Sequence, residues 1–383
     1  MKVLIVVCDL QVGGAEQVTL QLVRALAGRG FAFTIAAIKP GGVLAEGFAR
    51  SGAEVFDGVA RRRLDPLAPV RIARIIRRRD IEAVVIVDVT RNAMFYGLTG
   101  AALSRRKLLR ICWCHSPLGG TAGWFTGRLR RYRAFCSLDA VVCTTRLEKR
   151  LLADSGLGRR HTFVIHNGID LAQFAGPPPC KVPLPEGKKV IVQVANFMPH
   201  KDYPTLVAAA GKLAETRDDF HLLLAGRGTD CPQMQEAIAG ARLAGRATLL
   251  GCRDDIPAIL GAADIFVLAT RYEAFSVATL EAMASHLPII VSDTPAFDEM
   301  FTHGREGLKA PPGDADALAA AMARLLDDSE LRSRLAAAAA RRAQRFSLPR
   351  MAEAFARLLR AGGRGKQPLL NSRRPVPRAG FGR

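Results

Sequence analysis

The chain has 383 residues, 49 % of them hydrophobic and 23 % charged, and 55 Lys and Arg against 35 Asp and Glu give it a net charge of +20. This composition excludes a globally disordered chain, and at about 150 residues per domain the length predicts two or three domains. No apolar run approaches the ~18 residues of a membrane span. The eight cysteines have no regular spacing, and the start of the chain does not read as a secretion signal, so we expect reduced thiols in a cytoplasmic protein.

The first 175 residues alternate between short apolar runs and amphipathic segments. Val3–Val7 predicts a buried strand, Gly13-Gly14 a tight loop, and Glu16–Ala27 a helix. Continuous β-branched runs such as Ala83–Val87 are typical of parallel strands buried on both faces. We expect further strands at 31–38, 108–114, 140–144 and 162–165, and further helices at 70–79 and 93–103.

A proline-rich segment at 176–188 predicts a linker, because proline lacks the N–H that helices and central strands need. After it the alternation starts again, with strands expected at 190–194, 220–225, 247–250, 263–269 and 288–291 and helices at 203–215, 233–239, 256–260, 275–284, 315–326 and 331–345. The sequence thus predicts an α/β protein with two tandem Rossmann-like, doubly wound domains, at 1–175 and 189–348, and a cleft between them. A crossover helix is expected at 349–361 and a disordered basic tail at 362–383.

The positive charge is unevenly distributed. Residues 1–175 hold 27 Lys and Arg against 13 Asp and Glu, a net charge of +14, whereas residues 176–348 have a net charge of −2 and residues 349–383 one of +8. This polarity favours a protein that presents one basic face to an anionic surface over a general nucleic-acid coat.

Three polar or glycine-rich motifs follow strands of the first domain, where open α/β sheets bind their ligands. Gly13-Gly14 precedes a helix N-terminus, an arrangement that brings backbone N–H groups close to an anion, and it does not complete a G-x-G-x-x-G fingerprint. His115 follows the strand at 108–114 and is expected to make a polar contact in the cleft. His166-Asn167-Gly168-Ile169-Asp170 favours a structural turn before the linker.

In the second domain, Asn196, Gly226 and Arg253 each follow a predicted strand, and Lys201 opens the next helix, where a lysine suits a diphosphate.

The sharpest motif is Glu273-Ala274-Phe275-Ser276-Val277-Ala278-Thr279-Leu280-Glu281. One glutamate lies in a loop before a helix, and the other lies about two turns on, among apolar residues that make an idle carboxylate unusual. The helix start between them offers free N–H groups to a phosphate.

Together these residues resemble the retaining glycosyltransferases of family 4, which have the two-domain GT-B fold, and the resemblance covers about residues 1–360. It rests on the glycine pair, His115, the His166–Asp170 run, Lys201-Asp202 and the two glutamates, with support from Pro288–Asp293 and the Pro312-Gly313-Asp314 turn. It implies transfer of a hexose from a nucleotide sugar, with UDP-sugar favoured and GDP-mannose as the rival, with retention of anomeric configuration.

The resemblance implies a role for each candidate residue. His115 and Glu273 are the implied catalytic residues, near the reaction centre and the hexose hydroxyls respectively. The implied donor-binding residues are Gly13, Gly14, Asn196, Lys201, Gly226, Arg253, Phe275, Ser276, Val277 and Glu281. Two positions depart from the family pattern, since Asn196 replaces a basic residue and Ala274 replaces a glycine.

No metal and no other cofactor is expected. Asp314-Ala315-Asp316 has the spacing of a metal-binding D-x-D pair, but it opens a late helix and is expected to cap it. A lysine and helix dipoles can hold a diphosphate, and the resemblance implies that the leaving phosphate takes the acceptor proton.

The basic first domain is expected to bind the acceptor, a saccharide of the lipid-linked, lipopolysaccharide or exopolysaccharide type, at the anionic inner face of the membrane. The residues assigned to this face are Arg61, Arg62, Arg63, Arg105, Arg106, Lys107, Arg130 and Arg131. Two other functions stay open. A nucleotide-sugar epimerase or phosphorylase shares the architecture but would need acid and base residues that the sequence does not offer. A non-catalytic polyanion- or nucleic-acid-binding protein fits the charge, but the basic clusters lack interleaved aromatic residues, so no nucleic-acid partner is expected.

Overall fold

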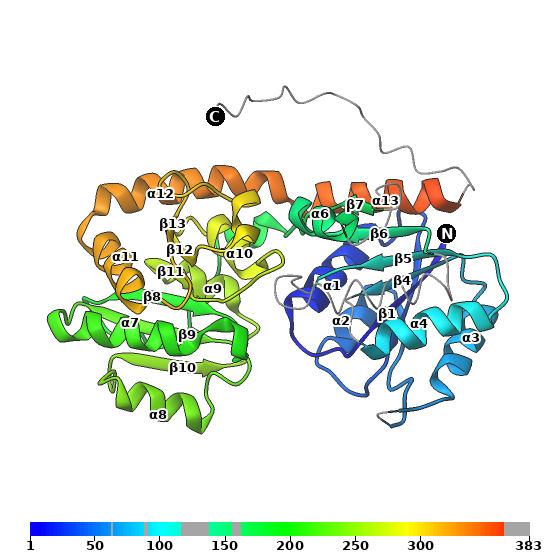
Figure 1. The fold of residues 1–383 in the computed structure, drawn as a ribbon, viewed down its shortest axis with the longest axis horizontal. Helices are drawn as coiled ribbons and strands as arrows, with labels where there is room; N and C mark the ends of the chain where they lie inside the picture. The colour runs from blue at the N-terminus through cyan, green and yellow to red at the C-terminus, as the bar shows by residue number, and fades with distance from the viewer. Residues whose placement is uncertain (63, 88–90, 116–137, 155–161, 364–383) are drawn as a thin grey trace.

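Two parallel β-sheets, one per domain, define the fold of this computed structural model, which describes residues 1–62, 64–87, 91–115, 138–154 and 162–363. Figure 1 shows the two domains as lobes side by side, with the N-terminus in the first lobe and the C-terminal helices running along both. Both sheets reverse their strand order beside their first strand, which is the topological switch point where such sheets bind ligands.

The first sheet has seven strands in the order β3-β2-β1-β4-β5-β6-β7, all paired in parallel. Helices α1, α2 and α13 contribute to the apolar cluster on one face, and α3, α4 and α6 to the cluster on the other. The strands are β1 (Lys2–Val7), β2 (Ala32–Ala37), β3 (Glu54–Phe56), β4 (Ala83–Val87), β5 (Leu109–Trp113), β6 (Ala140–Cys143) and β7 (Thr162–Val164), and the helices are α1 (Gly14–Leu26), α2 (Ala45–Arg50), α3 (Ala68–Arg78), α4 (Arg91–Leu103) and α6 (Arg146–Asp154).

The second sheet has six strands in the order β10-β9-β8-β11-β12-β13, again all parallel. Helix α7 packs with α8 and α11, and α10 packs with α9 and α12, around one core cluster. The strands are β8 (Lys189–Val194), β9 (Phe220–Ala225), β10 (Ala247–Gly251), β11 (Ile265–Leu268), β12 (Ile289–Ser292) and β13 (Leu308–Ala310), and the helices are α7 (Tyr203–Thr216), α8 (Pro232–Gly240), α9 (Ile256–Gly261), α10 (Val277–Ala284), α11 (Ala315–Asp327) and α12 (Ser329–Ala343).

The chain crosses between the domains twice, and the two crossings lie against each other. The Ile169 N–H donates to the Phe346 carbonyl at 3.1 Å, and the Leu348 N–H donates to the Ile169 carbonyl at 2.8 Å. A Cβ on Gly168 would lie 2.5 Å from the Ser347 carbonyl oxygen, so glycine permits this close approach. After the second crossing, α13 (Leu348–Gly363) packs on the first domain, as Figure 1 shows.

The structure confirms the predicted α/β architecture with two Rossmann-like domains. It adds four short elements that the sequence analysis did not predict, namely α2, β3, α6 and β13. It also corrects two boundaries. Helix α10 begins at Val277, so Phe275 precedes its N-cap, and α13 runs through Gly363, two residues into the segment predicted to be disordered. Gly362 is packed there, because a Cβ would lie 2.4 Å from a Leu109 methyl group.

Candidate donor site between the two domains

The N-termini of α1 and α10 meet at the interface between the domains. Gly13 is the N-cap of α1 and brings no side-chain cap of its own. The Glu16 carboxylate from the first turn lies against it, because a Cβ on Gly13 would be 2.4 Å from Glu16 Oε2. A Cβ on Gly14 would lie 3.7 Å from the Val277 side chain, and Val277, the first residue of α10, packs against the cores of both domains. Two helix N-termini at one place create a positive potential suited to an anion.

The N-terminus of α10 is capped by Ser276. Its hydroxyl accepts a hydrogen bond from the Thr279 N–H at 3.2 Å, so this N–H is already used. The N–H groups of Val277 and Ala278 have no partner among the residues that the structure describes, and they are the donors left for a phosphate. The Ser276 N–H also has no partner among the described residues, so the pair of Ser276 and Val277 stays a prediction, and Ala278 adds a third free N–H.

Asn196 links the two domains directly. Its side-chain amide donates to the Val12 carbonyl at 3.2 Å, and its side-chain carbonyl accepts from the Arg227 N–H at 3.0 Å. The loop after β9 lies close by because Gly226 has a φ of +145°, and a Cβ on it would lie 2.0 Å from the Ala195 carbonyl oxygen. In this state Asn196 binds backbone on both sides of the cleft, so it ties the glycine loop of α1 to the second domain.

Lys201 and Glu273 form an ion pair in which both side chains are largely buried, at 17 % and 10 % exposure. The loops that carry them are fastened together, since the His200 carbonyl accepts from the Arg271 N–H at 2.8 Å and from the Thr270 hydroxyl at 2.9 Å. From the sequence we expected the two residues to bind separate parts of the donor, Lys201 the diphosphate and Glu273 the hexose. The structure pairs them with each other, so a bound donor would have to exchange with this ion pair or bridge it.

Glu281 lies one turn inside α10, and no hydrogen bond to its carboxyl group is seen among the described residues. Burial alone raises the pKa of Glu281 to about 8. A carboxyl group in this state can both donate to and accept from sugar hydroxyls.

His115 follows β5 at the rim of the first domain. Its ring packs against Trp113 at 4.4 Å between centroids, and Trp113 in turn packs against Phe355 of α13. Burial lowers the pKa of His115 to about 3, so the ring is neutral. Its Nε2 is buried without a hydrogen-bond partner among the described residues, which leaves it available to a ligand hydroxyl.

Two of the predicted donor residues have side chains engaged elsewhere. The Phe275 ring is buried between the rings of His166 and Phe346, at 5.6 and 5.3 Å between centroids. Both neighbours lie beside the two crossings between the domains, which we call the hinge. Only the backbone of Phe275 is therefore free to reach a donor. Arg253 makes two hydrogen bonds, of 2.8 and 2.7 Å, to Asp255, and this pairing raises the pKa of Arg253.

A second contact across the hinge was not predicted from the sequence. Glu299 of the second domain accepts from the Leu147 N–H at 3.0 Å, at the start of α6 in the first domain, and lies 3.8 Å from the ring of His166. The next residue, Glu148, is buried, and its carboxylate accepts from the backbone N–H groups of Thr144 and Thr145. The run from Thr145 to Glu148 has the T-x-x-E pattern of a capping box, which is the signal that could have revealed this helix.

The Asp314-Ala315-Asp316 pair caps a helix, as predicted. Asp314 accepts from the Ala317 N–H at 2.9 Å at the start of α11, and Asp316 pairs with Lys212. Within the described ranges, no three His, Cys, Asp or Glu side chains are grouped so that they could hold a metal ion.

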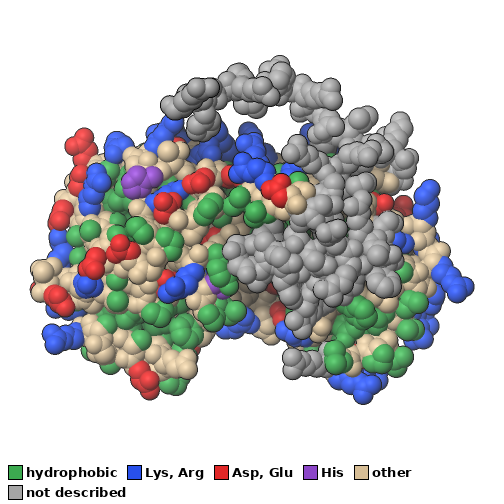
Figure 2. All heavy atoms as spheres, viewed as in Figure 1, with side chains coloured by type: hydrophobic (Ala, Val, Ile, Leu, Met, Phe, Trp, Pro, Cys, Tyr) green, Lys and Arg blue, Asp and Glu red, His purple; other side chains and the backbone are tan. Residues whose placement is uncertain are grey.

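Of the residues assigned to the basic face, Arg61, Arg62, Arg105 and Lys107 are exposed, whereas Arg106 is half-buried and pairs with Asp80 at 2.7 Å. Arg61 and Arg62 precede α3, and Arg105, Arg106 and Lys107 follow α4, which packs against α3. Arg63, Arg130 and Arg131 lie outside the described residues. Figure 2 shows basic and hydrophobic atoms together on the part of the first lobe where α3 and α4 lie.

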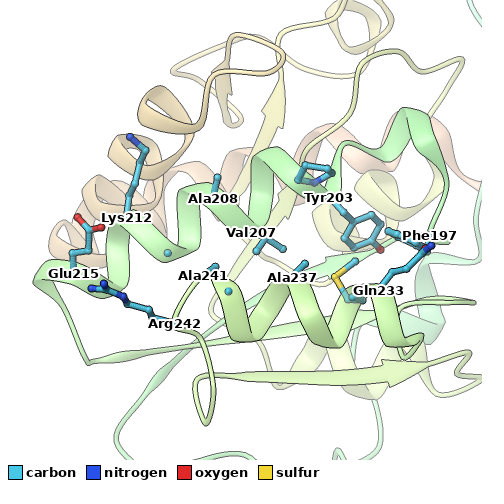
Figure 3. Close-up of a pocket in the computed structure, with 14 residues that line it drawn as sticks. Phe197, Tyr203, Val207, Ala208, Lys212, Glu215, Gln233, Ala237, Ala241 and Arg242 are labelled. Atoms are coloured by element: carbon cyan, nitrogen blue, oxygen red, sulfur yellow. The ribbon is translucent and has the colours of Figure 1, made fainter.

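A pocket of about 670 Å³ lies in the second domain between α7 and α8. Figure 3 shows Lys212, Glu215 and Arg242 at one end and Phe197 and Tyr203 at the other. None of the predicted site residues lines this pocket, so we do not assign the donor to it.

Two family profiles match the chain, one for each domain. The profile described as Glycosyltransferase Family 4 matches residues 12–173, and the one described as Glycosyl transferases group 1 matches residues 180–342. With the paired Rossmann-like domains and the polar residues gathered between them, these matches define a GT-B glycosyltransferase. The chain belongs to the family 4 glycosyltransferases.

Two relatives of this chain are named for lipopolysaccharide core biosynthesis. It is 26 % identical over 327 residues to the lipopolysaccharide core biosynthesis glycosyltransferase LpsE of Rhizobium meliloti, covering 85 % of this chain and 88 % of LpsE. It is 31 % identical over 268 residues to the lipopolysaccharide core biosynthesis mannosyltransferase LpsB of the same organism, covering 66 % of this chain and 72 % of LpsB.

Solved structures share the fold. The crystal structure of Anabaena HepE in complex with UDP and glucose superposes with a TM-score of 0.79 at 19 % identity, covering 94 % of this chain and all of that one.

Proposed function

We propose that this glycosyltransferase transfers a hexose from a nucleotide-sugar donor to a lipid-linked or lipopolysaccharide-type acceptor with retention of anomeric configuration. The observation that carries the donor part is the meeting of the α1 and α10 N-termini beside Lys201, Glu273 and Glu281. UDP-hexose is the favoured donor, as HepE is solved with UDP-glucose, and GDP-mannose is the rival, since LpsB is named a mannosyltransferase.

The diphosphate would lie at the two helix starts. The N–H groups of Val277 and Ala278 offer donors there, and the N-terminus of α1 would add its own once a phosphate displaces the Glu16 carboxylate beside Gly13. Lys201 adds a full positive charge once a phosphate draws it from Glu273. Together they would stabilise the charge that builds on the leaving diphosphate, with no metal ion required for that role.

The sugars would be held by Glu281 at the ribose, and by Glu273 and His115 at the hexose. A neutral His115 ring with an unpartnered Nε2 suits a hydroxyl near the reaction centre. The leaving phosphate would take the proton of the acceptor hydroxyl on the same face of the sugar, which leads to retention. Closure of the domains would position both substrates and exclude water.

Thermal unfolding in the presence of nucleotides tests the donor. At about 100 times its Kd, a bound nucleoside diphosphate adds about 2.7 kcal/mol to the free energy of unfolding. We expect one of UDP, GDP, ADP and CDP to stabilise the protein with or without EDTA, and Glu281→Ala to abolish most of this gain. Lack of response to all four would contradict the proposed donor class, and loss of the response in EDTA would contradict metal-independent binding.

We propose that the protein binds its acceptor at the anionic cytoplasmic surface of a membrane. Among the described residues, no helix combines the length and the apolar character needed to cross a bilayer. Beside the exposed arginines, however, Leu64, Leu67 and Val70 are 79 %, 57 % and 38 % exposed at the start of α3. Apolar side chains flanked by arginines are the composition of a surface that lies on anionic lipid.

Sedimentation with vesicles tests this docking. We expect binding to phosphatidylcholine vesicles with 20 mol% phosphatidylglycerol to exceed binding to pure phosphatidylcholine, to weaken with salt, and to fall several-fold in Leu64→Ser/Leu67→Ser. Val43→Ser, which removes another exposed apolar side chain (70 % exposed) ahead of α2, serves as the control. Equal binding to the two vesicle types would contradict peripheral attachment.

A further inference from the structure

A cavity of about 310 Å³ in the first domain lies between the loop after the edge strand β3 and one side of α3. Asp57 is its one acidic lining residue, and its arginines are Arg61, Arg71, Arg74, Arg78 and Arg79. Arg71, Arg74 and Arg78 are spaced three and four residues apart, so they share one face of the helix.

The acidic groups around this arginine pocket are already engaged. Asp65 binds Arg71 at 2.7 Å and also accepts from the Arg61 and Leu67 N–H groups. Asp57 accepts from the Gly41 N–H at 2.8 Å, so its charge is partly satisfied by backbone. Arg79 pairs with Glu54 and lies over the Phe56 ring.

The guanidinium groups of Arg61, Arg74 and Arg78 remain. All three residues are exposed, and none has an ion pair or side-chain hydrogen bond with the residues that the structure describes. Like charges gathered around one cavity repel each other, and an anion bound among them relieves that repulsion. Guanidinium groups match phosphate oxygens in geometry as well as charge.

The pocket opens at the same edge of the sheet as the donor site. The Val59 N–H donates to the Ala37 carbonyl, and the Ile38 N–H donates to the Val7 carbonyl, so backbone bonds connect the pocket through β2 to β1. With strands about 4.8 Å apart, the pocket lies roughly 10 Å along the carboxyl edge from the strand that leads to Gly13. A ligand anchored there could extend toward the cleft.

We propose that the arginine pocket binds a phosphate group that belongs to the acceptor or to the lipid surface that presents it. This inference rests on the proposed function, because it places acceptor recognition on the first domain at a distance from the transferred sugar. Arg74 and Arg78 supply the charge from α3, and Arg61 supplies it from the segment that precedes this helix. Half-buried Phe56 and buried Ile75 form an apolar wall for the carbon skeleton next to the phosphate.

The first experiment measures the broadening of the ³¹P line of inorganic phosphate on titration with protein. We expect saturable binding that weakens at least ten-fold in Arg74→Gln/Arg78→Gln. The matched control, Arg341→Gln/Arg345→Gln, removes two exposed arginines from the other domain and should leave the affinity unchanged. Absence of saturable binding, or equal affinity in the pocket variant and the wild type, overturns the proposal.

A second arm identifies the source of the phosphate. Vesicles of phosphatidylcholine with 20 mol% phosphatidic acid are compared with vesicles holding 20 mol% phosphatidylserine. If the pocket binds a lipid headgroup, the wild type prefers phosphatidic acid, inorganic phosphate competes, and the pocket variant loses the preference. If it binds a phosphate of the acceptor saccharide, both vesicles bind alike while binding of inorganic phosphate persists. Hydrolysis of nucleotide sugars by the wild type, assayed separately, reports on the proposed function.

Discussion

Lys201 and Glu273 hold each other in a largely buried position in this state. Two charges with this little solvent are stable only as a pair, and the exchange of Glu273 for a phosphate is what would make Lys201 a donor ligand. The same exchange would release Glu273 to accept from sugar hydroxyls, so the pairing links recognition of the phosphate to recognition of the hexose.

Removal of one partner of this pair should destabilise the protein. Lys201→Met leaves a carboxylate that is only 10 % exposed without its counter-charge, and we expect a loss of about 2 kcal/mol in the free energy of unfolding. The double variant Lys201→Met/Glu273→Gln should recover most of that stability without recovering donor hydrolysis. Thermal unfolding and a donor-hydrolysis assay measure the two effects. A double variant as unstable as the single one would show that the charges are not coupled.

At the scale of single elements, the short helix α6 explains how the first domain meets the hinge. Thr145 and Glu148 cap its N-terminus from within the first domain, and Glu299 binds the Leu147 N–H from the second. Burial, aided by the nearby Glu299, raises the pKa of Glu148 to about 7, although hydrogen bonds from Thr144 and Thr145 oppose the shift.

Glu148 should therefore make stability fall as the pH rises. Its folded-state pKa lies above the ordinary value of 4.5, so its contribution is fully present below pH 4.5 and is lost as the pH rises through about 7. In Glu148→Gln this contribution disappears. The change in the free energy of unfolding between pH 5 and pH 8 should then be smaller than in the wild type by up to about 3 kcal/mol. Urea unfolding of both proteins at the two pH values measures the difference.

The contributions of the histidines have the opposite sign. Burial lowers the pKa values of His115 and His166, so their contributions to the free energy of unfolding are lost as the pH falls below 6.5. The comparison with Glu148→Gln subtracts this shared background. Parallel pH profiles for the two proteins would contradict the assignment to Glu148.

At the scale of the whole molecule, three contacts between described residues link the two domains away from the crossings. Asn196 reaches the Val12 carbonyl, Glu299 reaches α6, and Val277 packs between the two cores. We expect contacts of this kind to break and reform as the domains open and close around a donor.

Loss of these contacts should favour an open arrangement. Each hydrogen bond contributes about 1 kcal/mol, so Asn196→Ala/Glu299→Ala should raise the ratio of open to closed molecules roughly thirty-fold. Small-angle X-ray scattering should then report a larger radius of gyration without nucleotide, and a smaller increase with it. Glu330→Ala, an exposed change on α12, is the control. An unchanged radius in the double variant would show that other contacts set the closure.

Local pattern determined much of this fold. Apolar runs such as Ala83–Val87 and Phe220–Ala225 became strands with the predicted bounds, because a continuous apolar run is stable only between two covered faces. The elements that were missed, such as β3 and β13, have three residues each, too few to carry a period. Strand β7 is equally short but was predicted, because its apolar run continues to Ile165. The domain pairing followed from the two rounds of strand–helix alternation and the proline-rich break between them.

The sequence by itself also determined which residues gather at the cleft, because residues that follow parallel strands share one edge of the sheet. Only the tertiary structure decided how they pair. It placed Lys201 against Glu273, turned the Phe275 ring into the hinge and made Asn196 a link between domains. These outcomes depend on contacts between residues 72 to 184 positions apart, which no local pattern of side chains encodes. The Lys201–Glu273 pair is set by packing within the second domain, and the Asn196–Val12 contact by the packing of one domain on the other.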